Sequence, residues 1–175
     1  THRDIADERL DYWLKPEKEA EINFDIRFGW TAAPYFINSY RSGESEVVDE
    51  LHRQGIAVGF FFFERAAAVS PEAAEALDRT IIADFRGMLS ETAPGAASVV
   101  GEAFSERRCY VEVMLWDSDR VFEAVQNWSS QASNVRAAAF RSYRRPAGIL
   151  FFKSADRSKN ASDAGDIADE ADEVS

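Results

Sequence analysis

The sequence is poor in the residues from which disulfides, metal centres and many active sites are built. It contains one cysteine, Cys109, so no disulfide can form within the chain. Its two histidines, His2 and His52, are not spaced in a way that would gather them around Cys109. Because zinc takes three or four protein ligands, usually nitrogen or sulfur, a zinc site is not expected. We predict neither a metal nor a cofactor.

Several catalytic motifs and any long apolar run are also missing. The sequence has no glycine-rich phosphate loop, no Gly-x-Ser-x-Gly elbow and no Cys-x-x-Cys pair. Its longest apolar run, residues 56–63, has the length of a strand, whereas a membrane helix needs about 20 apolar residues. The first residues do not resemble a signal peptide. We therefore expect a cytoplasmic protein without membrane contact, and we assign no catalytic residue.

Basic residues are fewer than acidic ones, and the resulting negative charge is unevenly distributed along the chain. The net charge is −11, from 31 acidic and 20 basic residues. The segment from Ser154 to Ser175 has seven acidic and two basic residues and almost no large apolar ones, which predicts a disordered acidic tail. The remaining body is also acidic. Such a charge disfavours nucleic-acid partners and favours basic protein partners.

Apolar residues make up 46% of the chain and aromatic residues 13%, which is enough for a sizeable core. Their periodicity alternates between the strand and the helix pattern. The elements expected, in chain order, are an amphipathic helix over 6–14, a strand at 22–28 ended by Gly29, an extended segment at 34–40, a helix capped by Ser45 and closed by Gly55, a strand at 56–64, a helix opened by Ser70, strands at 99–104 and 109–116, a helix capped by Ser118, and strands at 135–143 and 148–153.

From residue 56 onward this order is strand–helix–strand–strand–helix–strand. It predicts an α+β fold of the ferredoxin-like (βαββαβ) type with an antiparallel sheet. We divide the chain into an N-terminal helical extension (1–20), a single α+β domain (21–153) that begins with an added strand, and the disordered acidic tail (154–175).

The predicted strand 109–116 is apolar on both of its faces. Side chains alternate across a strand, so Cys109, Val111, Val113 and Leu115 share the face that the two later helices should cover. The opposite face is also mostly apolar, although an antiparallel sheet usually turns polar residues to an open side. We therefore expect this second face to be covered. The residues proposed to bind a ligand or partner there are Phe60, Phe62, Tyr110, Glu112, Met114 and Trp116.

Four coverings of the second face remain open: the N-terminal helix and the strand at 22–28, a second copy of the chain, a protein or small apolar ligand, or single-stranded RNA stacked on the aromatic residues. Glu112 and two further acids, Glu64 and Glu102, lie on predicted strands of one sheet. They could serve as a general base or a cation site, but the interpretation we favour is that of acids at strand ends or on wet faces.

One basic cluster stands against the acidic background. Its members are Arg136, Arg141, Arg144 and Arg145, interleaved with aromatic residues. Charges on an edge strand discourage sheet-to-sheet aggregation, and this is our first interpretation. The alternative is a docking site for an anion or an acidic segment.

The missing catalytic motifs and the acidic, aromatic-rich composition favour a non-catalytic protein that binds a protein partner. In layout alone, the chain resembles bacterial regulators that inhibit a ribonuclease by binding it, and toxin-neutralising immunity proteins. Two alternatives are a small-molecule enzyme or carrier built as a dimeric α+β barrel, and a single-stranded RNA-binding module. The partner is thus another protein or a second copy of the chain.

Overall fold

The computed structural model describes residues 10–12 and 26–155. Within them the chain forms an α+β fold around one antiparallel sheet with the strand order β1-β2-β4-β5-β3-β6-β7. The elements are β1 (Leu10–Tyr12), β2 (Ile26–Thr31), α1 (Pro34–Ser42), α2 (Glu46–Arg53), β3 (Ala57–Arg65), α3 (Pro71–Thr92), β4 (Ala97–Ser105), β5 (Arg108–Leu115), α4 (Ser118–Gln131), β6 (Val135–Ser142), the short 3-10 helix η2 (Arg145–Ala147) and β7 (Ile149–Lys153).

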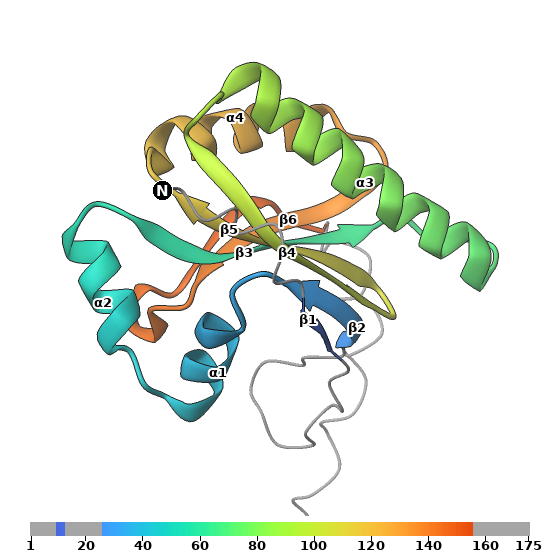
Figure 1. Cartoon of the computed structure of the whole chain (residues 1–175). Helices are drawn as coiled ribbons and strands as arrows, with labels where there is room; N and C mark the ends of the chain where they lie inside the picture. Colours follow the sequence, from blue (N-terminus) through green and yellow to red (C-terminus); the bar gives the residue numbers. More distant parts are fainter. Residues whose placement is uncertain (1–9, 13–25, 156–175) are drawn as a thin grey trace, which may run out of the picture.

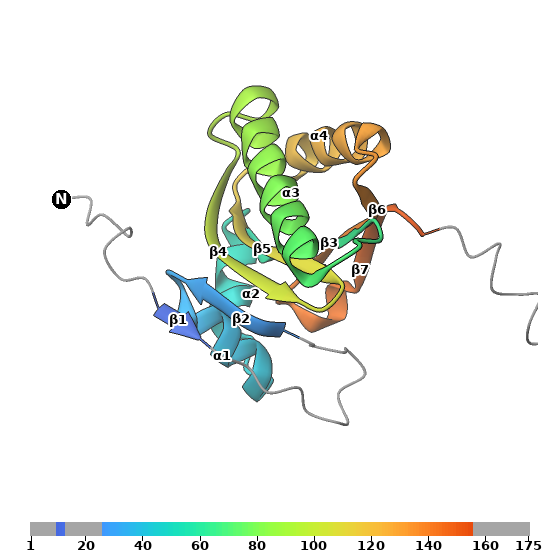
Figure 2. The same cartoon turned by 90° about the vertical axis from the view of Figure 1, so that its right-hand side faces the viewer.

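Helices lie on both faces of the sheet. α3 and α4 cover one face, and α1 and α2 lie against the other (Figures 1 and 2). The core under α3 and α4 contains Cys109, Val111, Val113 and Leu115, as the alternation of β5 predicts. A second core lies between the sheet and the α1–α2 pair. Both apolar faces of β5 are therefore covered.

The predicted helices after Ser45 and Ser70 form where the sequence indicates. Ser45 stands at the cap position of α2 but makes no side-chain capping bond, since its hydroxyl donates to the Asp49 carboxylate. The Ser70 side chain accepts a hydrogen bond from the backbone N–H of Ala73, and Pro71 occupies the first turn of α3. A proline is tolerated there because the first-turn N–H groups have no intrahelical acceptor. The cap of α4 is Asp117 rather than Ser118, because the Asp117 carboxylate accepts from the N–H of Arg120.

One predicted extended segment is wrong. Residues 34–40 form most of helix α1, not a strand. The aromatic and β-branched residues in this stretch suit strands, but Phe36 and Tyr40 lie one helical turn apart and are both buried against the sheet. Burial of this face, together with Pro34 at the first turn, outweighs the local strand preference.

The N-terminal predictions are corrected where the structure describes them. Residues 10–12 form the strand β1, paired with β2, so the helix predicted over 6–14 is not helical at these residues. β2 continues past Gly29 to Thr31, because it pairs along its length with β4. The remaining residues of both predictions, and the predicted acidic tail from residue 156, lie outside the described residues.

The sheet is wider than the four strands of a ferredoxin-like sheet. β2 and β1 extend it beyond β4, and β7 extends it beyond β6, so its order differs from that of a four-stranded ferredoxin-like sheet. Among the described residues, α1 and α2 cover the second face. The N-terminal helix, one of the coverings considered, falls mostly outside the described residues, and its residues 10–12 form a strand. Within the described ranges, no helix has the length and apolar character needed to cross a membrane.

Candidate functional site

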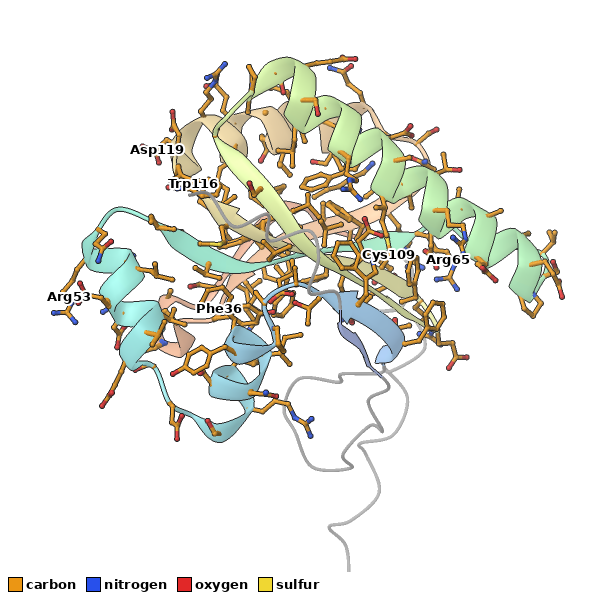
Figure 3. The ribbon with its side chains drawn as sticks, in the orientation of Figure 1. Phe36, Arg53, Arg65, Cys109, Trp116 and Asp119 are labelled. Atoms are coloured by element: carbon orange, nitrogen blue, oxygen red, sulfur yellow. The ribbon has the colours of Figure 1, made fainter. Side chains whose placement is uncertain are left out.

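The six residues predicted to bind a ligand on the second sheet face do not form an open surface. Phe60 and Tyr110 are buried beneath α1 and α2, and Phe62 and Met114 are partly buried at the margin of the same core. Figure 3 shows Phe36, from α1, in the layer below the sheet. Trp116 follows the end of β5 and is 47% exposed. The second face is thus mainly a second hydrophobic core.

Glu112 lies inside this core, although the sequence indicated a wet-face acid. It is 5% exposed, and both of its carboxylate oxygens accept hydrogen bonds. The Thr31 hydroxyl donates to Oε2 at 2.5 Å, and the Tyr143 hydroxyl donates to Oε1 at 2.9 Å. The backbone N–H of Ala33 in turn donates to the Thr31 hydroxyl oxygen at 2.9 Å. Glu112 therefore joins β5 to the start of α1 and to the residue that follows β6.

The environment of Glu112 also sets its protonation. Burial raises the pKa of the Glu112 carboxyl to about 7, while the hydrogen bonds from Thr31 and Tyr143 lower it. Aromatic rings surround the network, with Tyr143 beside Phe36 and Phe60. A carboxyl group with such a pKa can exchange a proton near neutral pH. Its burial and its two donors make it an internal hydrogen-bond acceptor that links separate segments of the fold.

Gly101 provides the space that this carboxylate occupies. A Cβ atom at Gly101 would lie 2.5 Å from Glu112 Oε2 and 2.8 Å from the backbone oxygen of Trp30. We expect Gly101→Ala to destabilise the protein by about 1–3 kcal/mol, because the Trp30 backbone cannot move aside without disturbing the pairing of β2 with β4. Urea unfolding measures the change.

The matched control is Gly87→Ala, where a Cβ meets nothing within 4 Å. Gly87 lies inside α3, so alanine there should stabilise the protein by up to about 1 kcal/mol through its helix propensity. Equal and small effects at both glycines would show that the close approach at Gly101 is unimportant.

The predicted basic cluster is not a single positive surface. Arg144 Nε lies 2.7 Å from Asp49 Oδ1 on α2, and Arg136 NH1 lies 3.6 Å from Glu64 Oε1. Arg141 stacks on the Tyr40 ring, with its guanidinium carbon 5.8 Å from the ring centroid. Acidic neighbours thus neutralise two of these arginines, and Arg145 lies in η2.

Among the described residues, no group of three or more His, Cys, Asp or Glu side chains is arranged to hold a metal ion. Cys109 is fully buried, and burial raises the pKa of its thiol well above the ordinary value. A buried thiol of this kind is chemically inert.

A groove runs between α3 and α4 on the side of these helices that does not face the sheet core. Its volume is about 750 Å³. The side chains and backbone that line it are those of Ala83, Asp84, Gly87, Met88, Glu91, Thr92, Arg120, Glu123, Ala124, Asn127, Trp128 and Gln131. We call this feature the α3–α4 groove.

The α3–α4 groove has an apolar part and an acidic part. Ala83, Gly87 and Ala124 are small, which leaves room between the helices, and Met88 and Trp128 add larger apolar surface. The three carboxylates of the groove are those of Asp84, Glu91 and Glu123. Within the described chain, none of these carboxylates forms an ion pair or hydrogen bond with another side chain.

Sequence reasoning missed this groove, although its components were visible. The apolar stripe of α3 was predicted to face the core, and it does, with Ile81 and Phe85 buried. Comparison of the chain with family models, with curated proteins and with solved structures finds no match.

Proposed function

We propose that the protein is a non-catalytic binding protein that engages a basic segment of another protein through the α3–α4 groove. The observation that carries this proposal is the combination of a groove of about 750 Å³, an apolar lining and three unpaired carboxylates. Pockets that bind ligands in proteins have volumes of about 300–1,000 Å³. The net charge of −11 adds a long-range attraction for a basic partner.

The location of the buried acid supports binding rather than catalysis at this groove. Glu112 belongs to the core under α1 and α2, whereas the groove lies on the helices that cover the other face of the sheet. The lining residues of the groove include no histidine and no cysteine. Their three carboxylates against one arginine, Arg120, leave a net charge of −2, which is suited to attract a cation.

The shape of the groove favours a helical segment as the occupant. Two helices form its walls, and small residues on both walls allow a third helix to approach closely. Amphipathic helices bind such grooves through apolar residues at three- and four-residue spacing. The partner helix would place one or two apolar side chains over Met88 and Trp128, and lysine or arginine near Asp84, Glu91 and Glu123.

The two alternative functions have less support. A dimeric α+β barrel would use the second sheet face as its interface, and α1 and α2 occupy that face. An RNA-binding sheet would require Tyr110 to be accessible, but it is buried.

We further propose that β3–α3–β4–β5–α4–β6 is a ferredoxin-like core with added edge strands. Its support is the inner strand order β4-β5-β3-β6.

A selection of displayed random peptides on the immobilised protein tests the proposed function. We expect the selected peptides to be enriched in lysine or arginine together with large apolar residues. Their binding should fall by at least about 30-fold in the double variant Asp84→Lys/Glu123→Lys, because two charge pairs are lost and replaced by repulsion, about 1 kcal/mol for each.

The matched control carries the same change of charge elsewhere. Glu44→Lys/Glu46→Lys alters two exposed acids at α2, on the other side of the sheet, and should reduce binding by less than about threefold. Equal losses in both double variants would show that only the net charge matters. Undiminished binding to the Asp84→Lys/Glu123→Lys protein would refute the groove as the site.

A further inference from the structure

The outermost strand on one side of the sheet, β7, has an open apolar edge. β7 pairs with β6 and is last in the strand order, so no described strand pairs with its other side. Three successive residues of β7 are strongly exposed: Ile149 at 40%, Leu150 at 45% and Phe151 at 58%. Edge strands of this kind are usually protected by charges, by proline or by a covering element. The β7 residues before Lys153 include no charge and no proline, and the covering contact here is the hydrogen bond that Gln126 Nε2 on α4 donates to the Phe152 backbone oxygen at 3.0 Å.

The register shows which face of the sheet each β7 side chain shares. Ile149 lies opposite Arg141, and Phe151 lies opposite Ala139, so both belong to the face of α1 and α2. Leu150 lies opposite Phe140, which belongs to the core under α3 and α4. An extended segment that pairs with β7 would therefore find apolar surface on both of its own faces.

A positive group that lacks a carboxylate partner in the described part of the chain lies on β6, the strand next to this edge, with its guanidinium over the Tyr40 ring. The Nε atom of Arg141 is buried and has no hydrogen-bond partner within the described residues. Arg141 also forms no ion pair there, in contrast to Arg144 with Asp49. Arg141 as a whole is only partly buried, so a carboxylate can approach its guanidinium and form a strong, charge-assisted hydrogen bond. Arg141 lies directly across from Ile149, the first residue of β7.

We propose that β7 is a docking site for an extended segment of a partner protein, which pairs with the strand edge and places a carboxylate at Arg141. The backbone of the segment would pair with the N–H and C=O groups on the outer edge of β7, apart from the Phe152 oxygen that already accepts from Gln126, and its apolar side chains would cover Ile149 and Phe151. This mode of recognition, in which a peptide adds a strand to a sheet, derives affinity from the backbone and specificity from alternate side chains. The site is separate from the α3–α4 groove and has the opposite charge preference.

A second copy of the chain fits this edge less well. The strand Ile149–Lys153 has no acidic residue, so a second β7 would bring no carboxylate to Arg141. It would bring Lys153, which adds positive charge to this edge. Each copy also carries a net charge of −11, so two copies repel each other at long range. The chemistry of the edge therefore favours a different chain with an acidic residue among apolar ones.

Two blocked hexapeptides of alternating valine and threonine test the proposal, one with a central glutamate and one with a central lysine. Each is titrated into the full-length protein labelled with ¹⁵N. We expect the glutamate peptide to perturb the backbone amides of residues 149–153 and to bind about tenfold more tightly than the lysine peptide, the effect of one charge-assisted pair. Phe151→Lys should abolish binding of the glutamate peptide, whereas Val69→Lys, at a fully exposed site before α3, should not.

Exchange of the charge at Arg141 makes the test specific. Arg141→Glu should reverse the preference, so that the lysine peptide binds more tightly. If that variant does not fold, Arg141→Gln serves instead and should bring the two affinities within about twofold of each other. A tenfold preference that persists in Arg141→Gln would overturn the proposal. So would sedimentation showing a dimer that Phe151→Lys dissociates, because a second copy would then occupy the edge.

Discussion

Replacing Glu112 with glutamine is expected to stabilise the protein at alkaline pH by about 3 kcal/mol, and to have almost no effect at about pH 4. In the folded state burial raises the pKa of Glu112 from its ordinary value of 4.5 to about 7. Below about pH 4.5 the carboxyl is protonated in both the folded and the unfolded state, so it adds no pH dependence. Between the two values the folded state binds more protons, and the free energy of unfolding falls as pH rises.

Above about pH 7 the buried carboxylate is charged, and the full loss in the free energy of unfolding caused by burying that charge is present. Glutamine has nearly the same shape and no charge, so it removes this cost while keeping groups that can hydrogen-bond to Thr31 and Tyr143. Urea unfolding across this pH range measures the effect. Glu44→Gln, an exposed acid, is the control and should change stability by less than about 0.5 kcal/mol at every pH. Parallel pH profiles for wild type and Glu112→Gln would contradict a buried, titrating Glu112.

Replacing Arg65 with methionine is expected to destabilise the protein by about 3–5 kcal/mol at about pH 8. Arg65, the last residue of β3, and Asp78, on α3, are both largely buried, with Arg65 NH1 3.1 Å from Asp78 Oδ2. A second guanidinium nitrogen donates to the backbone oxygen of Glu106, in the β4–β5 turn. Without Arg65, the Asp78 carboxylate would be buried and unpaired.

The stability lost in Arg65→Met should be smaller at low pH. Burial already raises the pKa of Asp78 to about 6, and Arg65 is the group that lowers it. Removing Arg65 raises this pKa further, so the variant loses more stability as pH rises and loses least where Asp78 is protonated. The double variant Arg65→Met/Asp78→Asn should recover much of the stability. Arg79→Met, which breaks an exposed pair with Glu75, should cost less than about 1 kcal/mol. Equal losses for Arg65→Met and Arg79→Met would contradict this interpretation.

The parts of the fold that follow from the alternation of side chains between the two faces of a strand could be predicted from the sequence. Cys109 to Leu115 alternate between two apolar faces, and this pattern correctly requires a layer on each side of the sheet. What supplies the second layer could not be predicted. Residues 34–40 have a local preference for strands, and they become helical because Phe36 and Tyr40 are buried by residues distant in the sequence, among them Phe60 and Tyr143.

The candidate site was less predictable than the fold. Glu112 resembled a solvated strand acid, because its donor Thr31 lies 81 positions away along the chain. The α3–α4 groove depends on how two helices are placed relative to one another, and the periodicity of either helix carries no such information. The open edge of β7 likewise depends on its place at the end of the strand order.

The most direct test of the proposed function is to map where a selected basic peptide binds, by backbone amide shifts of the ¹⁵N-labelled full-length protein. The proposal predicts that the perturbed amides lie in residues 83–92 and 120–131, and that the affinity falls steeply with added salt. Perturbations confined to β7 or to α1 and α2, or an affinity independent of salt, would contradict it.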